Sequence, residues 1–208
     1  MTLILVRHAE STGNSGGTIQ GWTDTELTEV GRAQAVAVAQ RLAAMSPVAI
    51  YSSPLARARE TADAVAQVSG LAAVELDDLR ERYYGQAQGL TWTEASVRWP
   101  AQAAHDRDWA TAVPDVESLA ALRARAVAVV SGLMNQHRDD VAVCVSHGGT
   151  LVQVIAHLFG LPVDVWPRIR MSNTSVTIVE GPAEQPLVRT LNDICHLEDR
   201  ERASTLAL

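Results

Sequence analysis

LILVRHAESTGN, residues 3–14, places an uninterrupted apolar run directly before an arginine and a histidine. The run Leu3–Val6 predicts a short strand buried on both faces, because a strand with one solvated face would alternate apolar and polar residues. Arg7 and His8 then stand where this strand ends. The same pattern, an apolar run followed by polar side chains, recurs further along the chain.

Other apolar runs alternate with helical stretches. Three of them resemble the first run and predict further strands buried on both faces: Val48–Tyr51, Ala73–Leu76 and Val141–Val145. Alanine-rich stretches with charges on one side predict amphipathic helices at Thr28–Met45, Pro54–Val68 and Glu117–His137, and another after Gly149 running to Phe159. Thr28, and Ser53 followed by Pro54, are typical helix starts. Two more strands are expected near the end, at Ser175–Val179 and Leu187–Leu191.

This alternation predicts an α/β fold, a three-layer α/β/α sandwich with a mostly parallel sheet. Residues 84–116 do not fit the alternation, since they hold three of the five tryptophans and two prolines. We expect them to form a small helical insertion over the active site. The 208 residues are enough for one well-cored unit, so the chain is expected to be a single domain, 1–208.

Composition narrows the range of partners. The net charge of −7 disfavours binding to nucleic acid or to an anionic membrane. No apolar stretch approaches the ~20 residues of a membrane span. The two cysteines, Cys144 and Cys195, lack the spacing of a metal site or a redox pair, which together with the absence of a signal-like start favours a cytoplasmic location. The sequence leaves open whether the chain forms a homodimer.

Charged and polar residues follow each of the first four expected strands. Arg7 and His8 follow the first, Arg57 lies shortly after the second, Glu81 follows the third and His147 follows the fourth. The carboxyl ends of parallel strands lie along one edge of a sheet, where ligands bind. We therefore expect these five side chains to converge, although up to about 140 residues separate them.

These residue types suit phosphoryl transfer. Arginine forks and helix N-termini hold a phosphate dianion. A neutral imidazole can attack phosphorus when an acceptor fixes its tautomer, and a carboxylic acid can protonate the leaving alkoxide. Each residue taken alone also has an ordinary explanation: Arg57 as a solvated helix residue, Glu81 as part of a surface ion cluster with Arg80 and Arg82. Their expected meeting at one edge favours a phosphoryl-transfer site.

Several motifs resemble those of the histidine phosphatase superfamily, also called phosphoglycerate-mutase-like. The similar stretches, in the family's order, are LVRHAESTGN (5–14), GWTDTELTEVGRAQA (21–35), YSSPLARARETA (51–62), LRERYYGQAQGL (79–90) and VSHGG (145–149). The resemblance spans about residues 2 to 180. It implies a metal-independent phosphoric monoester hydrolase that acts on a small phosphorylated substrate and needs no cofactor.

The resemblance also implies roles for particular residues. His8 would be the nucleophile that becomes phosphorylated, and Glu81 the general acid and later the base that activates water. The residues expected to bind the phosphoryl group or the rest of the substrate are Arg7, Arg57, His147, Asn14, the backbone N–H of Gly148, Arg82 and Tyr84.

Two other functions stay open. The stretch Glu81–Gly85 also resembles the phosphoglycerate mutases, but those enzymes carry a lysine near the position of Thr91 and an asparagine where this chain has Gly149. Fewer cations would weaken retention of a doubly charged intermediate, which favours hydrolysis over a mutase reaction. A non-catalytic phosphoryl-binding protein is the third alternative, disfavoured because every expected catalytic side chain is present.

Overall fold

The computed structural model describes residues 1–100, 108–163, 166 and 168–197. Within these residues, six strands form one mixed sheet in the order β3-β2-β4-β1-β5-β6. The strands are β1 (Thr2–Arg7), β2 (Ala49–Ser52), β3 (Ala73–Glu75), β4 (Val141–Ser146), β5 (Val176–Glu180) and β6 (Leu187–Asp193). The first four run parallel to one another, whereas β5 and β6 are antiparallel to their neighbours.

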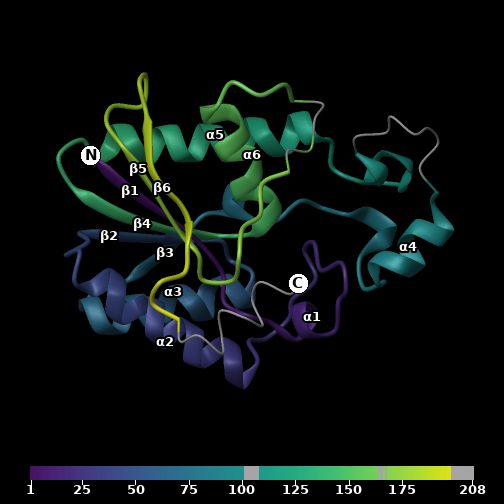
Figure 1. Ribbon diagram of the computed structural model, residues 1–208, viewed down its shortest axis with the longest axis horizontal. Helices are drawn as coiled ribbons and strands as arrows, with labels where there is room; N and C mark the ends of the chain where they lie inside the picture. Colours follow the sequence, from purple (N-terminus) through teal and green to yellow (C-terminus); the bar gives the residue numbers. More distant parts are fainter. Residues whose placement is uncertain (101–107, 164–165, 167, 198–208) are drawn as a thin grey trace.

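Helices cover both faces of the sheet, as the alternating sequence predicts. Figure 1 shows α5 (Leu119–Gln136) and α6 (Gly148–Leu158) on one face, with α2 (Glu29–Ala43) and α3 (Ala56–Ser69) on the other. This arrangement confirms the expected α/β class.

The apolar run of β1 supplies side chains to both layers of the core. Leu3 and Leu5 pack in the cluster beneath α5 and α6, whereas Ile4 and Val6 pack in the cluster beneath α2 and α3. Successive strand side chains point to opposite faces, so a strand covered on both faces has to be apolar at every position. All four side chains are fully buried.

The third expected strand differs from the prediction. β3 is an edge strand that pairs only with β2, and Val74 in its centre is 51% exposed. The prediction of burial on both faces was therefore wrong for β3, in which both Val74 and Glu75 are exposed.

The start of α3 also differs from the prediction. The helix begins at Ala56, two residues after Pro54. Leu55, not Ser53, is the N-cap residue, and the Ser53 hydroxyl accepts the N–H of Leu55 at 3.3 Å and lies 2.7 Å from Nε2 of His147. The first N–H of the helix is capped by a carboxylate distant in the sequence, since the Ala56 N–H donates to Oδ1 of Asp24 at 2.8 Å.

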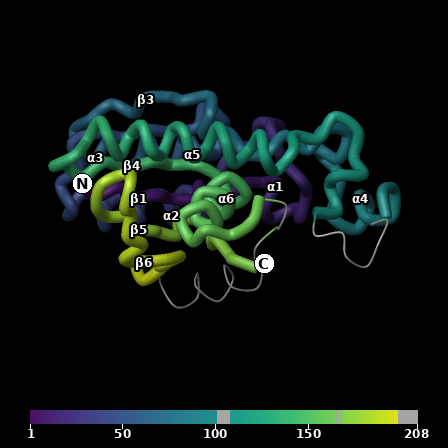
Figure 2. The backbone as a smooth tube through the Cα atoms, turned by 90° about the horizontal axis from the view of Figure 1, so that it is seen from above, coloured from purple at the N-terminus to yellow at the C-terminus, as the bar shows by residue number. Residues whose placement is uncertain are grey.

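The expected insertion, residues 84–116, contains α4 (Trp92–Arg98) and two 3₁₀ turns, Gly85–Ala87 and Trp109–Ala112. Its residues 101–107 lie outside the described part of the chain. In both views α4 stands beyond the helices that flank the sheet (Figure 1 and Figure 2). Residues of the insertion such as Tyr84 and Ala95 form a small core together with Ile19. The remaining described elements are α1 (Thr12–Ser15) and a 3₁₀ turn at Asp77–Leu79.

Candidate active site

His8 lies directly after β1, at the carboxyl edge of the parallel strands. Its side chain is 3% exposed, and Nδ1 is 2.7 Å from the carbonyl oxygen of Ala9. A carbonyl can only accept, so Nδ1 carries the proton and Nε2 keeps its lone pair. Burial, followed by the charges of Arg57 and Arg7, lowers the pKa of His8 well below its usual range. The imidazole is therefore neutral at physiological pH, as a nucleophile requires.

His147 follows β4, and its ring lies close to that of His8, with 5.1 Å between centroids. It is fully buried, and Nε2 pairs with the hydroxyl of Ser53. Burial, followed by the charge of Arg57, lowers its pKa well below the usual range. Nδ1 is buried with no hydrogen-bond partner among the described residues. The expected contact of His147 with phosphate stays a prediction.

Two arginines place positive charge beside His8. Arg57 is 1% exposed and donates from its two terminal nitrogens to the carbonyls of Thr23 and Gly21, at 3.0 and 2.8 Å. Arg7 donates to the carbonyl of Met171 at 2.6 Å. Burial lowers the pKa of each arginine to about 10, so both stay charged at neutral pH. Among the described residues, neither arginine forms a salt bridge with a carboxylate, and buried cations of this kind form a strong anion site.

Glu81 comes from the segment after β3 and points to the start of α6. One carboxylate oxygen accepts the N–H of Gly149 at 2.9 Å and the other accepts the N–H of Thr150 at 3.1 Å. A helix N-terminus favours a negative group there. A Cβ at position 149 would lie 2.4 Å from Oε1 of Glu81, so this close approach requires glycine.

A cavity of about 620 Å³ joins these groups. Its wall includes six residues that the sequence predicts for the site: Arg7, His8, Asn14, Arg57, Glu81 and Gly148. The aromatic part of the wall consists of Tyr84, Trp92, Trp109 and Trp166. His147 is fully buried and does not line the cavity. The topology thus brings together the side chains that the sequence predicts at the strand ends.

Arg82 and Tyr84 also line the cavity, but the Arg82 charge is already paired. Its two terminal nitrogens bond both oxygens of Asp108 at 2.7 Å, and its Nε donates to the carbonyl of Glu117. Tyr84 stacks on Trp109, and burial together with Glu81 raises its pKa, so its phenol stays protonated. Their expected contacts with substrate stay predictions.

Asn14 is oriented by a network. Its Oδ1 accepts the N–H and the hydroxyl of Ser11 at 3.1 and 2.9 Å, and it also accepts Nδ2 of Asn173 at 3.3 Å. With the oxygen taken, its amide N–H groups are the part available to a phosphate in the cavity. Asn173 also donates to the carbonyl of His8 at 3.0 Å.

The sequence analysis missed several residues of this wall, namely Gln20, Trp166, Arg170 and Asn173. Their positions follow no strand end of the parallel set and match none of the quoted motifs. Asn173 reaches His8 only because β5 turns back antiparallel to β1.

Among the described residues, no three His, Cys, Asp or Glu side chains are grouped so as to hold a metal ion. None of the described helices is both long and apolar enough to cross a bilayer.

Known proteins with similar sequences support this description. The sequence pattern of the histidine phosphatase superfamily (branch 1) matches residues 3–194. A metal-independent phosphoserine phosphatase of Arabidopsis thaliana is 33% identical over 200 residues, covering 94% of this chain and 82% of the relative. A glucosyl-3-phosphoglycerate phosphatase of Mycolicibacterium vanbaalenii is 39% identical over 189 residues, covering 86% and 84%.

Among solved structures, a mycobacterial glucosyl-3-phosphoglycerate phosphatase in complex with VO3 has a TM-score of 0.83 at 35% identity. The match covers 93% of this chain and 99% of that one. The sequence and structural similarities therefore extend over nearly the whole chain.

Proposed function

This chain belongs to the histidine phosphatase superfamily, and we propose that it hydrolyses a small phosphorylated metabolite through a phosphohistidine on His8. The observation that carries the proposal is a neutral imidazole, fixed by the Ala9 carbonyl, beside two buried arginine cations at the wall of one cavity. This combination supplies a nucleophile and an anion site without a metal ion.

In the first step, Nε2 of His8 attacks phosphorus while the bond from phosphorus to the ester oxygen breaks. Arg7 and Arg57 stabilise the phosphoryl oxygens, which carry the charge in the transition state. The leaving oxygen takes a proton from the Glu81 carboxyl. The products are an alcohol and a phosphohistidine, and Glu81 is left as a carboxylate.

In the second step, water attacks the phosphohistidine. The Glu81 carboxylate takes the proton from the attacking water, and the bond from phosphorus to Nε2 breaks. Inorganic phosphate leaves, and His8 and the Glu81 acid are both regenerated. The N–H groups of Gly149 and Thr150 hold the Glu81 carboxylate between the two steps, which supports its use as the base in the second step.

Two observations favour hydrolysis over a mutase reaction. The two relatives compared above are both named as phosphatases. Arg82, a cation that could hold a second anionic group of an intermediate, is instead paired with Asp108. A mutase has to keep such an intermediate bound while it reorients, whereas a phosphatase releases the alcohol.

The deciding test is Glu81→Gln, measured in a single turnover. We expect phosphorylation of His8 by an alkyl phosphate to slow by about 10²- to 10⁴-fold, since its alkoxide needs a proton. Phosphorylation by p-nitrophenyl phosphate should slow far less, because p-nitrophenolate leaves without one. Equal losses on both substrates would show that Glu81 does not deliver the proton. Absence of phosphate release from either substrate by the unmodified protein would favour a non-catalytic binding function.

A further inference from the structure

We infer that Arg125, a residue of α5 outside the cavity, is a positioning residue that sets the Glu81 carboxyl for proton transfer. The inference rests on the proposed function, because it assigns Arg125 an effect on the proton-transfer step alone. Arg125 does not line the cavity and touches neither His8 nor the anion site in any described contact.

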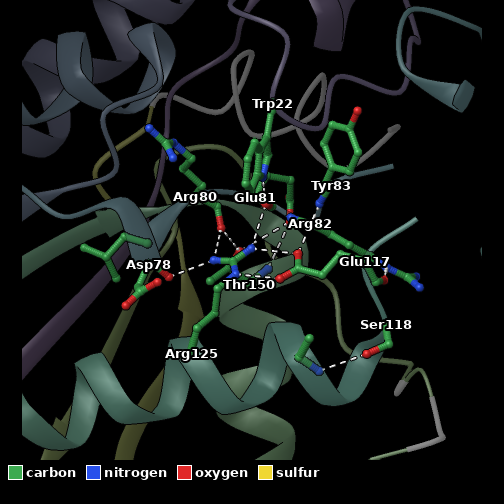
Figure 3. Close-up of polar contacts among 12 residues, drawn as sticks. Trp22, Asp78, Arg80, Glu81, Arg82, Tyr83, Glu117, Ser118, Arg125 and Thr150 are labelled. Carbon is green, nitrogen blue, oxygen red and sulfur yellow. Dashed lines mark hydrogen bonds and ion pairs between the residues drawn. The ribbon is translucent and has the colours of Figure 1, made fainter. Parts of the chain in front are cut away.

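Arg125 donates hydrogen bonds to the backbone segment that carries Glu81 (Figure 3). Its Nη1 donates to the carbonyls of Asp78 and Arg80, both at 2.7 Å, and its Nη2 donates to the carbonyl of Glu81 at 2.8 Å. One side chain therefore binds three carbonyls within four successive residues. Such a segment lacks a regular partner strand, so these bonds fix its path.

Glu117 completes the arrangement by orienting Arg125. Its two oxygens accept from Nε at 2.7 Å and from Nη2 at 2.9 Å. All five N–H groups of the guanidinium are thus used, three on carbonyls and two on the carboxylate. Oε2 of Glu117 also accepts the N–H of Tyr83 at 3.2 Å. The pair is mostly buried, with 15% and 14% of the side chains exposed.

The same segment is held from its other sides. Nε1 of Trp22 donates to the Glu81 carbonyl at 2.7 Å, and the Thr150 hydroxyl donates to the Arg80 carbonyl at 2.8 Å. With its backbone fixed by Arg125 and Trp22, Glu81 turns its carboxylate to the N–H groups at the start of α6. Loss of Arg125 removes three of these backbone bonds at once.

A purely structural contribution of Arg125 would lower activity equally on every substrate. Misplacement of the Glu81 carboxyl instead harms only substrates whose leaving group needs a proton. The difference between an alkyl phosphate and p-nitrophenyl phosphate therefore separates the two explanations.

The experiment measures single-turnover phosphorylation of His8 with both substrates. Arg125→Lys keeps the charge but cannot bind three carbonyls and a carboxylate together. We expect it to slow the alkyl phosphate roughly 30-fold and p-nitrophenyl phosphate less than about threefold, since a displacement near 1 Å costs up to about 10²-fold. Glu117→Gln, which keeps the shape and removes the charge, should give the same selectivity with a smaller loss, and it carries the test if Arg125→Lys does not fold.

Arg189→Lys is the control. Arg189 forms an ion pair with Glu180 at 2.8 Å, and Glu180 pairs with Thr2 at the opposite edge of the sheet. The control should leave both rates unchanged.

Glu81→Gln is measured beside these variants. A selective loss in Glu81→Gln but not in Arg125→Lys or Glu117→Gln overturns the inference and leaves the proposed function standing. An equal loss on both substrates in the Arg125 variant overturns it in the same way. If Glu81→Gln itself shows no selectivity, the proposed proton donor is wrong, whatever Arg125→Lys does.

Discussion

Replacing Gly149 by alanine should disable proton transfer without unfolding the protein. The added Cβ would lie 2.4 Å from Oε1 of Glu81, whereas ordinary van der Waals contact begins near 3.4 Å. The carboxyl therefore has to retreat by about 1 Å, and Trp166, with one ring atom 3.1 Å from the same Cβ, limits the directions open to it. A displacement of this size costs about 10²-fold in rate, or roughly 2.7 kcal/mol in the barrier.

The assay is a single turnover with an alkyl phosphate, paired with thermal unfolding. Gly149→Ala should unfold within a few degrees of the parent, because alanine suits a helix better than glycine by roughly 0.5–1 kcal/mol, which offsets part of the strain. Gly132→Ala is the matched control: Gly132 lies in α5, and a Cβ there would meet nothing within 4 Å. It should keep full activity. A Gly149→Ala rate within about threefold of the parent would refute the argument from close approach.

Three further results are expected. His8→Ala should abolish turnover while the protein stays folded, since loss of a nucleophile costs several orders of magnitude; a circular dichroism spectrum checks folding, and retention of more than about a tenth of the activity would exclude His8 as nucleophile. Activity should be unchanged by EDTA, because Arg7 and Arg57 supply the charge; restoration of a chelated sample by Mg²⁺ or Zn²⁺ would contradict this. Stability should fall with acid, because the unfolded chain binds protons at His8 and His147 below the usual pKa of 6.5 whereas the native state does not. Above about pH 6.5 the two histidines leave the free energy of unfolding unchanged. Below that pH, each histidine lowers the free energy of unfolding by about 1.4 kcal/mol per pH unit. Urea titrations at several pH values measure this slope, and an unchanged slope in His147→Asn would count against the argument.

The parts of the fold that local sequence determines were predictable. A run such as Leu3–Val6 is apolar at each position only if both faces are covered, and the structure confirms that for β1. Residues directly after such strands meet at one edge by topology, so His8, Arg57 and Glu81 could be grouped without a structure. β3 shows the limit, because it contains Glu75 and lies at the edge of the sheet, where two of its three residues are exposed.

The contacts that orient the site are long-range and left no local pattern. Asn173 bonds the carbonyl of His8 across 165 positions, and Arg125 bonds that of Glu81 across 44. The prediction of where α3 starts was wrong for the same reason, since the group that caps its first N–H is Asp24, which is distant in the sequence. Residues that act through partners far away in the sequence are recognised only in the folded structure.

The buried pair of Arg82 and Asp108 has a consequence for engineering. Arg82 belongs to the segment that carries Glu81, whereas Asp108 lies in the insertion that supplies Trp92 and Trp109 to the cavity wall. Exchanging the insertion for that of another family member would alter the cavity wall. If the new insertion lacked the aspartate, the buried guanidinium of Arg82, one residue from Glu81, would lose its carboxylate partner. Breaking such a pair from one side costs about 3–5 kcal/mol. A chimera therefore has to transplant both residues together.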